Sequence, residues 1–257
     1  MSVNKMFPEY ERYSVQNCPL CGQANIMVVN GLVSITNDKT VLTPDQGYSF
    51  CNCKNVWYTN WKNIDQTSYY GDEYSNFHYR ERYRNEIERL FKGYLPTLKK
   101  HGNGGNKLLD IGCIVDFFVD IATKHGYDCT GLDIEKHSLN ECKFITADFD
   151  NYEPDHKYDI IFFNHVIEHL HYPMRSFKKL YNMLNDGGLL FVSAPDPFQV
   201  NWDMPERWSS WCVRQHYIMW DMDSLVDEFE ERGFTTLLNK RNVDLRWLQD
   251  YHLLFKK

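Results

Sequence analysis

The spacing of apolar and polar residues predicts a different structure at the N-terminus from that in the rest of the chain. Apolar and polar residues alternate over Ile26–Val33 and Ser34–Leu42, which predicts a pair of hairpin strands. Thr43–Gly47 has the composition of a turn. From Asn76 to Lys100 the apolar residues recur at helical spacing, and Pro96 is expected to bend or end this helix.

From Lys107 onward, short apolar runs alternate with amphipathic segments. The continuous run Tyr158–Phe163 predicts a central parallel strand that is covered on both faces. Helices are predicted at 116–125, 173–185 and 224–232, the second of them ending at the glycines of 186–188. This alternation predicts a doubly wound α/β sheet, with strands expected at 107–111, 128–133, 142–146, 158–163, 189–193, 234–238 and 247–255.

The stretch Lys107–Asp133 reads as strand, glycine turn, helix and second strand, which is a βαβ unit of nucleotide-binding type. The turn at Gly112 would bring backbone N–H groups and a helix N-terminus to the ligand. Asp133, at the end of the second strand, could accept hydrogen bonds from ribose hydroxyls. The turn is not rich in glycine, however, because Ile114 and Asp116 follow Gly112 within it.

Composition and charge narrow the class of protein. The formal net charge is −7 and the chain has no cluster of Lys and Arg, so a polyanion-binding surface is not expected. The first residues contain no apolar signal segment, and no run approaches the ~18 apolar residues of a membrane span. A cytoplasmic protein is therefore expected, in which eight cysteines serve as thiols or metal ligands rather than disulfides.

Four of the cysteines form two close pairs near the N-terminus. Cys18 and Cys21 have the spacing of a zinc knuckle, and Cys51 and Cys53 form a tighter C-x-C pair. Together they predict a tetrahedral structural zinc site, with free buried thiols as the alternative. We therefore expect a small β-rich, zinc-ribbon-like module over residues 1–75 and an α/β domain over residues 76–257.

Several motifs occur in the order of a known family. The text LLDIGC…GLD…ADF…YDIIFFNHVIEHL…LNDGGLLFVSAP, over roughly residues 76 to 240, resembles class I S-adenosylmethionine-dependent methyltransferases. It is most similar to the group with HVLEHL-like text after the fourth strand. The tail around Arg207, Trp208, Trp211 and His216 and the cysteine module are also similar to that group, many of whose members act on sugars and other small metabolites. The resemblance implies a Rossmann-like sheet of seven strands.

The resemblance also implies where the cofactor binds. The acids that follow the second and third strands would hold the ribose and the adenine amino group, and the residues after the fourth strand would lie beside the methionine moiety. The implied cofactor residues are Asp110, Gly112, Cys113, Asp133, Ile134, Asp148, Phe149, Asn164 and His165. Two positions depart from the family. Ile114, as a β-branched residue, is not expected to adopt the glycine-like backbone of this loop, and Asp116 is expected near the carboxylate or amino group of the cofactor.

Methyl transfer from a sulfonium requires alignment and removal of a proton from the acceptor. His165, Glu168 and His169 share one face of a helical turn after the fourth strand. They predict a general base, a metal site completed by His216, or a structural role. His165, His169 and His216 are the candidate catalytic residues.

The expected function is therefore S-adenosylmethionine-dependent methyl transfer to a small molecule, with the hydroxyl of a sugar or nucleotide sugar as first choice. One alternative is a catalytically weak or inactive binding protein that keeps the fold but has lost the cofactor through Ile114 and Asp116. The other is a nucleic-acid methyltransferase, against which the acidic net charge counts.

Overall fold

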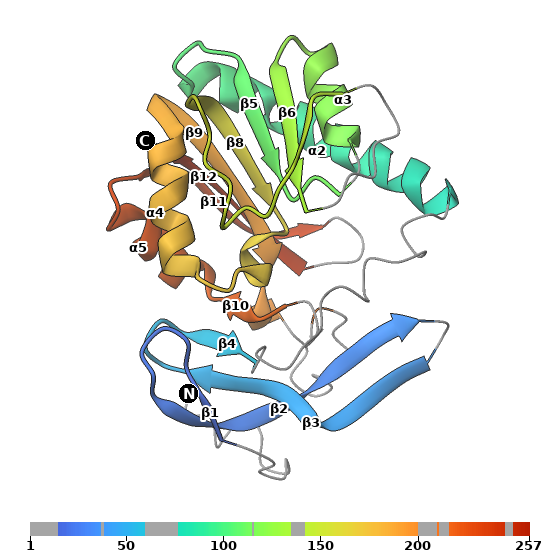
Figure 1. Ribbon diagram of the computed structural model, residues 1–257, viewed down its shortest axis with the longest axis vertical. Coiled ribbons are helices and arrows are strands. Elements are labelled where there is room, and N and C mark those ends of the chain that lie inside the picture. Colours follow the sequence, from blue (N-terminus) through green and yellow to red (C-terminus); the bar gives the residue numbers. More distant parts are fainter. Residues whose placement is uncertain are drawn as a thin grey trace.

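A computed structural model gives the architecture (Figure 1). It describes residues 15–36, 39–59, 77–114, 116–134, 142–199, 210, 216–244 and 249–257. The tail residues Arg207, Trp208 and Trp211 and the predicted domain boundary at residues 75–76 lie outside these ranges. None of the described helices has the length and apolar content needed to cross a membrane.

The described residues form two sheets, of which the larger has seven strands in the order β11-β12-β9-β8-β5-β6-β7. The strands β5 to β9 pair in parallel, whereas β12 runs antiparallel to both of its neighbours, β9 and β11. This confirms the predicted doubly wound, Rossmann-like sheet. The strands are β5 (Lys107–Ile111), β6 (Asp128–Asp133), β7 (Phe144–Thr146), β8 (Tyr158–Asn164), β9 (Leu184–Pro195), β11 (Thr235–Asp244) and β12 (Gln249–Lys256).

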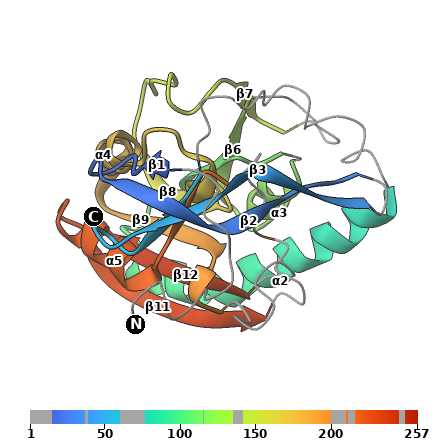
Figure 2. The same cartoon turned by 90° about the horizontal axis from the view of Figure 1, so that it is seen from below.

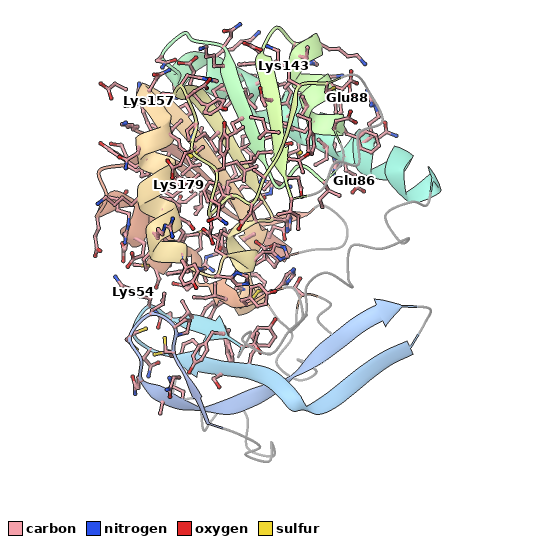
Figure 3. The ribbon with its side chains drawn as sticks, in the orientation of Figure 1. Lys54, Glu86, Glu88, Lys143, Lys157 and Lys179 are labelled. Atoms are coloured by element: carbon pink, nitrogen blue, oxygen red, sulfur yellow. The ribbon has the colours of Figure 1, made fainter. Side chains whose placement is uncertain are left out.

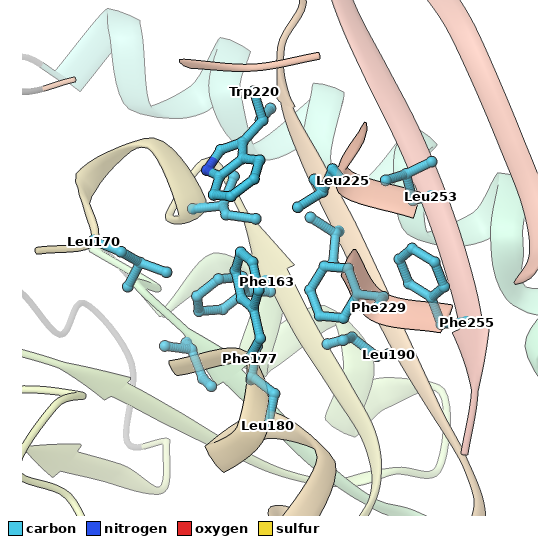
Figure 4. Packing of buried hydrophobic residues seen from close by; sticks show 14 of the residues in the cluster. Phe163, Leu170, Phe177, Leu180, Leu190, Trp220, Leu225, Phe229, Leu253 and Phe255 are labelled. Carbon is cyan, nitrogen blue, oxygen red and sulfur yellow. The ribbon is translucent and has the colours of Figure 1, made fainter. Parts of the chain in front are cut away.

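Helices cover both faces of this sheet because alternate residues of its central strands point to opposite sides. Ile160 and Phe162 of β8 pack in one apolar cluster with α2 (Phe77–His101) and α3 (Phe117–Lys124). Ile161 and Phe163 pack in the other with α4 (Pro173–Met183) and α5 (Met222–Glu230). Figure 4 shows Phe163 among the side chains of these two helices. The continuous apolar run of β8 is thus explained by burial on both faces.

The smaller sheet has the order β1-β2-β3-β4-β10, and all its pairings are antiparallel. The long strands β2 and β3 cross the view seen from below (Figure 2). Its fifth strand, β10, comes from the C-terminal part of the chain. Two short 3₁₀ helices precede β10 in sequence, η3 (Ile167–His169) and η4 (Pro197–Gln199). The strands are β1 (Val15–Asn17), β2 (Ala24–Thr36), β3 (Lys39–Cys51), β4 (Val56–Tyr58) and β10 (Ile218–Trp220).

Two local predictions are wrong, and for a third, on Pro96, the alternative that it ends the helix is excluded. Residues 43–47 do not end a strand: they lie within β3, where the register jumps from Asn30↔Gly47 to Leu32↔Leu42. Helix α2 continues past Pro96 to His101. Helix α4 ends at Met183, and the glycines of 186–188 lie within β9, at a register shift against β8. The turn-like residues of 43–47 and 186–188 lie in irregular stretches of strands, a place that glycine and polar residues also favour.

Candidate functional site

The turn between β5 and α3 is built as a tight backbone loop. Gly112 has a φ of +72° and its N–H donates to the carbonyl of Leu132, 2.8 Å away. A Cβ at Gly112 would lie 2.5 Å from Cγ2 of Val166, so only glycine fits between the turn and the segment after β8. The turn that the sequence predicted is therefore present, and it is packed directly against the HVIEH segment.

Asp133 ties this turn to the end of β6. Its two carboxylate oxygens accept hydrogen bonds from the backbone N–H groups of Ile114 and Ile134, each at 2.7 Å. A carboxylate oxygen has further lone pairs, so ribose hydroxyls can still donate to it. Ile134 beside it is one of the large apolar side chains that are exposed, at 46%.

Ile114 adopts the backbone conformation that we did not expect of it. Its φ is +48°, in the left-handed region that β-branched residues rarely occupy. The N–H bond to Asp133 holds it there. Such a conformation costs of order 1–3 kcal/mol and persists only where the surroundings fix it. The sequence departs from the family at this position, but the loop geometry does not require glycine to form.

Asp116 is the second position at which the sequence departs from the family. Its side chain is fully buried at the start of α3, and its carbonyl accepts from the N–H of Asp120. The expectation that Asp116 lies near the carboxylate or amino group of the cofactor stays a prediction.

A pocket opens at the carboxyl ends of β5 and β8, the edge at which doubly wound sheets bind ligands. The space within it is about 350 Å³, a volume that includes the solvent at its open mouth. Strand, turn and helix residues line it: Ile87, Leu90, Asp110, Gly112, Cys113, Phe117, Phe118, Phe162 and Asn164.

The surroundings of two polar residues in this pocket favour one protonation state for the first and one orientation for the second. Burial, together with the nearby charge of Asp133, raises the pKa of Asp110 well above its ordinary value. A protonated Asp110 can donate a hydrogen bond to a ligand. Asn164 is oriented by Ser193, whose hydroxyl donates to its side-chain oxygen at 2.5 Å.

The third predicted cofactor acid lies farther along the same edge. Asp148 is exposed and accepts from the backbone N–H of Asp150 at 3.0 Å and from the side chain of Asn151 at 2.8 Å. Phe149 is buried and packs against Phe163, with ring centres 5.6 Å apart. Its place beside an adenine ring stays a prediction.

His165, directly before Val166 in the chain, lies between two buried carboxylates. Its Nδ1 is 3.3 Å from Oε1 of Glu168, and its Nε2 is 3.1 Å from Oδ2 of Asp250. Burial by itself would lower the pKa of His165, but Asp250 and Glu168 together raise it well above its ordinary value. A doubly protonated imidazole cannot accept a proton, so the arrangement argues against the predicted base role of His165.

Glu168 connects this ion pair to the other two histidines. Burial would raise its pKa, but the hydrogen bond from His165 and the nearby His169 and His216 lower it to about 2. Its Oε2 is buried and has no hydrogen-bond partner among the described residues. Glu168, His169 and His216 each have one atom that could bind a metal ion, and these three atoms lie within 4.8 Å of one another.

His216 is fixed in one tautomer by its surroundings. Its Nδ1 lies 2.8 Å from the carbonyl oxygen of Ser210, so Nδ1 carries the proton and Nε2 has the free lone pair. Burial lowers the pKa of His216 to about 4, which keeps the ring neutral at neutral pH. The rings of His169 and His216 meet edge to face with centres 5.0 Å apart. The structure thus brings together two of the three predicted catalytic histidines.

The four predicted cysteine ligands converge at one end of the N-terminal sheet. Sγ of Cys18 lies 3.7 Å from that of Cys53, and Sγ of Cys21 lies 3.6 Å from that of Cys51. All four sulfurs lie within 4.8 Å of one another. A tetrahedron with Zn–S bonds of about 2.3 Å has S···S edges of ~3.8 Å. The residues therefore fit a zinc ion.

Sequence reasoning missed the buried partner of His165 and the apolar wall of the pocket. Asp250 is the one acid in the final strand, Gln249–Lys256, which was an available signal. Its contact with His165 depends on sheet order, because β12 pairs with β9 and β9 with β8. The sequence identified Ile87 and Leu90 of α2 as part of the apolar face of a helix, but it gave no sign that they line the pocket.

Comparison with known proteins agrees with this geometry. The family described as "Methyltransferase domain" matches residues 77–239. Trans-aconitate 2-methyltransferase of Escherichia coli O157:H7 strain EC4115 is 36% identical over 104 residues, covering 40% of this chain and 35% of that protein. Phosphoethanolamine N-methyltransferase 1 of Zea mays is 24% identical over 155 residues, covering 54% of this chain and 30% of that protein. The chain thus spans about a third of the length of these relatives.

Solved structures share the fold. A SAM-dependent methyltransferase from Archaeoglobus fulgidus superposes with a TM-score of 0.55 at 18% identity, covering 72% of this chain and all of that one. Magnesium protoporphyrin IX methyltransferase from Synechocystis PCC 6803, with bound SAH, gives a TM-score of 0.53 at 17% identity over 73% of this chain and 90% of that one. Since the family match covers well over half of the sequence, the chain belongs to the class I S-adenosylmethionine-dependent methyltransferases.

Proposed function

We propose that the protein binds S-adenosylmethionine at the carboxyl edge of β5, β6 and β8 and transfers its methyl group to a small molecule. The observation that carries this proposal is the pocket, with Asp110, Gly112 and Asn164 in its wall. Asp133 and the exposed Ile134 end the neighbouring strand and would receive the ribose and adenine. Cys113, Asp148, Phe149 and His165 complete the proposed cofactor site.

The methyl donor supplies the leaving group, so the chain must align the acceptor and take up its proton. When bound, S-adenosylmethionine would supply the methyl group to an acceptor hydroxyl and would leave as the neutral thioether. In our proposal the hydroxyl proton passes to Nε2 of His216, whose Nδ1–H is anchored on Ser210.

The buried Glu168 would stabilise the imidazolium that forms. Its low pKa keeps it anionic, and His165 with Asp250 holds it in place. His169, edge to face with His216, is the second group that could take the proton. His165 serves in this mechanism as a fixed positive charge rather than as a base.

As acceptor we propose the hydroxyl of a sugar or nucleotide sugar. The resemblance of the cysteine module and the HVIEHL segment to sugar-modifying members of the family supports this choice. The net charge of −7 counts against nucleic acid as the acceptor. The relatives compared above methylate other small molecules according to their names, so the acceptor has to be found by experiment.

A mass screen tests the proposal. The protein is incubated with S-adenosylmethionine and a pool of UDP- and dTDP-sugars, and products are sought that are heavier by one methylene unit. We expect a product whose rate falls by about 10²–10⁴-fold in His216→Ala, the usual contribution of a general base. His156→Ala is the control, because this histidine pairs with Asp155 and is outside the cluster. An unchanged rate in His216→Ala would refute His216 as the base, and an unchanged rate in His169→Ala as well would refute the second group.

We also propose that Cys18, Cys21, Cys51 and Cys53 bind a structural zinc ion. The proposal is supported by sulfur spacings of 3.6 and 3.7 Å, close to the edge of a zinc–thiolate tetrahedron. Metal analysis of the purified protein should give close to one zinc per chain, and Cys51→Ser should lose it. Cys142→Ser, at a thiol outside the cluster, should keep it. Equal zinc in both variants would contradict the assignment.

A further inference from the structure

The N-terminal sheet ends in a strand that belongs, by sequence, to the catalytic half of the chain. β10 pairs with β4 in the register Ile218↔Tyr58, Met219↔Trp57 and Trp220↔Val56. The side chain of Trp220 is at the same time buried in the catalytic core, with its ring 5.5 Å from that of Phe177 (Figure 4). One three-residue strand thus joins the backbone of the smaller sheet to the packing of the larger one.

The residues directly before β10 include the proposed base. The hydroxyl of Tyr48, in β3, donates to the carbonyl of His216 at 2.6 Å. The N–H of Thr59, just after β4, donates to the carbonyl of Tyr217 at 2.9 Å, and the N–H of Tyr217 donates to the carbonyl of Glu168 at 2.7 Å. The backbone of 216–217 is therefore held from one side by the N-terminal sheet and from the other by η3.

Further contacts fix the orientation of the N-terminal sheet at this junction. The ammonium of Lys54 lies 2.5 Å from the buried carboxylate of Glu228 in α5, and Figure 3 shows Lys54 at the upper edge of the N-terminal sheet. The N–H of Asp221 donates to the carbonyl of Asn55 at 3.3 Å. Because these residues flank β4, rotation of the N-terminal sheet would also displace β10.

We propose that the N-terminal sheet is a working part of the acceptor site, with Tyr48 as the residue that positions His216. This inference rests on the proposed role of His216 as the base. Tyr48 is fully buried, so water does not compete for its bond to the His216 carbonyl. An error of about 1 Å in the placement of a catalytic group can lower a rate by roughly 10²-fold. Loss of the Tyr48 hydroxyl, which holds the backbone of His216, is therefore expected to lower the turnover rate.

Hydrogen exchange measured by NMR tests the positioning without any acceptor. In Tyr48→Phe the amides of Tyr217 and Thr59 should exchange about fivefold faster, the factor that an ordinary hydrogen bond contributes. Tyr58→Phe is the matched control: it removes the same group from a neighbouring buried tyrosine whose hydroxyl accepts from Asn25. It should leave both amides unchanged. Equal exchange in wild type and Tyr48→Phe overturns the inference.

Turnover of the UDP- and dTDP-sugar pool tests the consequence for catalysis. Tyr48→Phe should lower kcat about tenfold while the KM for S-adenosylmethionine stays unchanged. It should have no further effect in a His216→Ala background, because the hydroxyl acts through His216. A loss of kcat that persists in full in that background overturns the inference.

The two proposals fail in distinguishable ways. If His216→Ala lowers kcat and Tyr48→Phe does not, the positioning role is wrong and the proposed base stands. If His216→Ala leaves kcat unchanged, the proposed base is wrong and Tyr48 loses its catalytic role with it. If wild type methylates no member of the pool, the proposed substrate class fails, and the exchange comparison still decides whether Tyr48 positions the segment.

Discussion

Replacing Gly112 by alanine perturbs the cofactor turn at the point where it meets the segment after β8. The left-handed φ of +72° costs an alanine about 1–2 kcal/mol. The added Cβ would also lie 2.5 Å from Cγ2 of Val166. A β-branched valine has little rotational freedom, so relief requires the backbone to move, at about 1–3 kcal/mol. Gly112→Ala should therefore lower the free energy of unfolding by about 2–5 kcal/mol.

Gly126→Ala separates the two contributions. Gly126 has a φ of +92°, and a Cβ there would meet nothing within 4 Å, so only the conformational cost of about 1–2 kcal/mol applies. Urea unfolding monitored by tryptophan fluorescence measures both variants. Val166→Ala combined with Gly112→Ala should recover part of the loss. Equal losses in the two glycine variants, together with no recovery in the double variant, would refute the close packing of the turn against Val166.

Three further predictions concern the loop, the buried ion pair and the metal. Ile114→Gly should raise the free energy of unfolding by about 1 kcal/mol or leave it unchanged, because the φ of +48° is unstrained in glycine; a clear loss of stability contradicts this. His165→Gln should cost about 3–5 kcal/mol at neutral pH, because it leaves Asp250 and Glu168 uncompensated. Because the pKa of His165 is raised, its contribution to the free energy of unfolding is complete below its ordinary pKa of 6.5 and is lost as pH rises through the raised value. The pKa of Glu168 is lowered, so its contribution is complete above 4.5 and is lost as pH falls toward 2. Wild type should thus lose stability on both sides of this window and His165→Gln should not, as urea unfolding at a series of pH values will show. Zinc chelation should lower the melting temperature of wild type and leave that of Cys51→Ser unchanged; no shift in wild type counts against a structural zinc.

The parts of the fold that were predictable have strong local patterns. Tyr158–Phe163 is a continuous apolar run because helices cover both faces of β8, and that cause operates within the run itself. The turn of Gly112 and the acid Asp133 were likewise readable, because strand, turn and helix follow one another directly. The four cysteines lie close together, as their arrangement in two sequence pairs predicted, although β2 and most of β3 lie between the two pairs in sequence.

The errors arose where one residue type serves two structures. Glycines and polar residues at 43–47 and 186–188 were interpreted as a turn and a helix cap, but both stretches lie at register shifts within strands. Ile114 was judged from its intrinsic preference, and the bond to Asp133 overrides that preference.

The remaining features depend on contacts between distant segments. Asp250 reaches His165 only because β12 inserts antiparallel between β9 and β11. β10 pairs with β4, and the carbonyl of His216 accepts a hydrogen bond from Tyr48, which lies more than half the chain away in sequence. The order of strands in a sheet leaves no local signal in the sequence, so neither contact could have been predicted from it.

Calorimetric titration with S-adenosylmethionine tests the central claim most directly. Wild type should bind one molecule per chain. Asp133→Ala should weaken the affinity by at least tenfold, since it removes the carboxylate that holds Ile114 and that we propose as the partner of the ribose. Asp128→Ala, at the opposite end of the same strand and paired with Lys143 on the surface, should bind like wild type. Absence of heat from wild type at millimolar ligand, or equal affinity in the two aspartate variants, would contradict a cofactor site at this edge of the sheet.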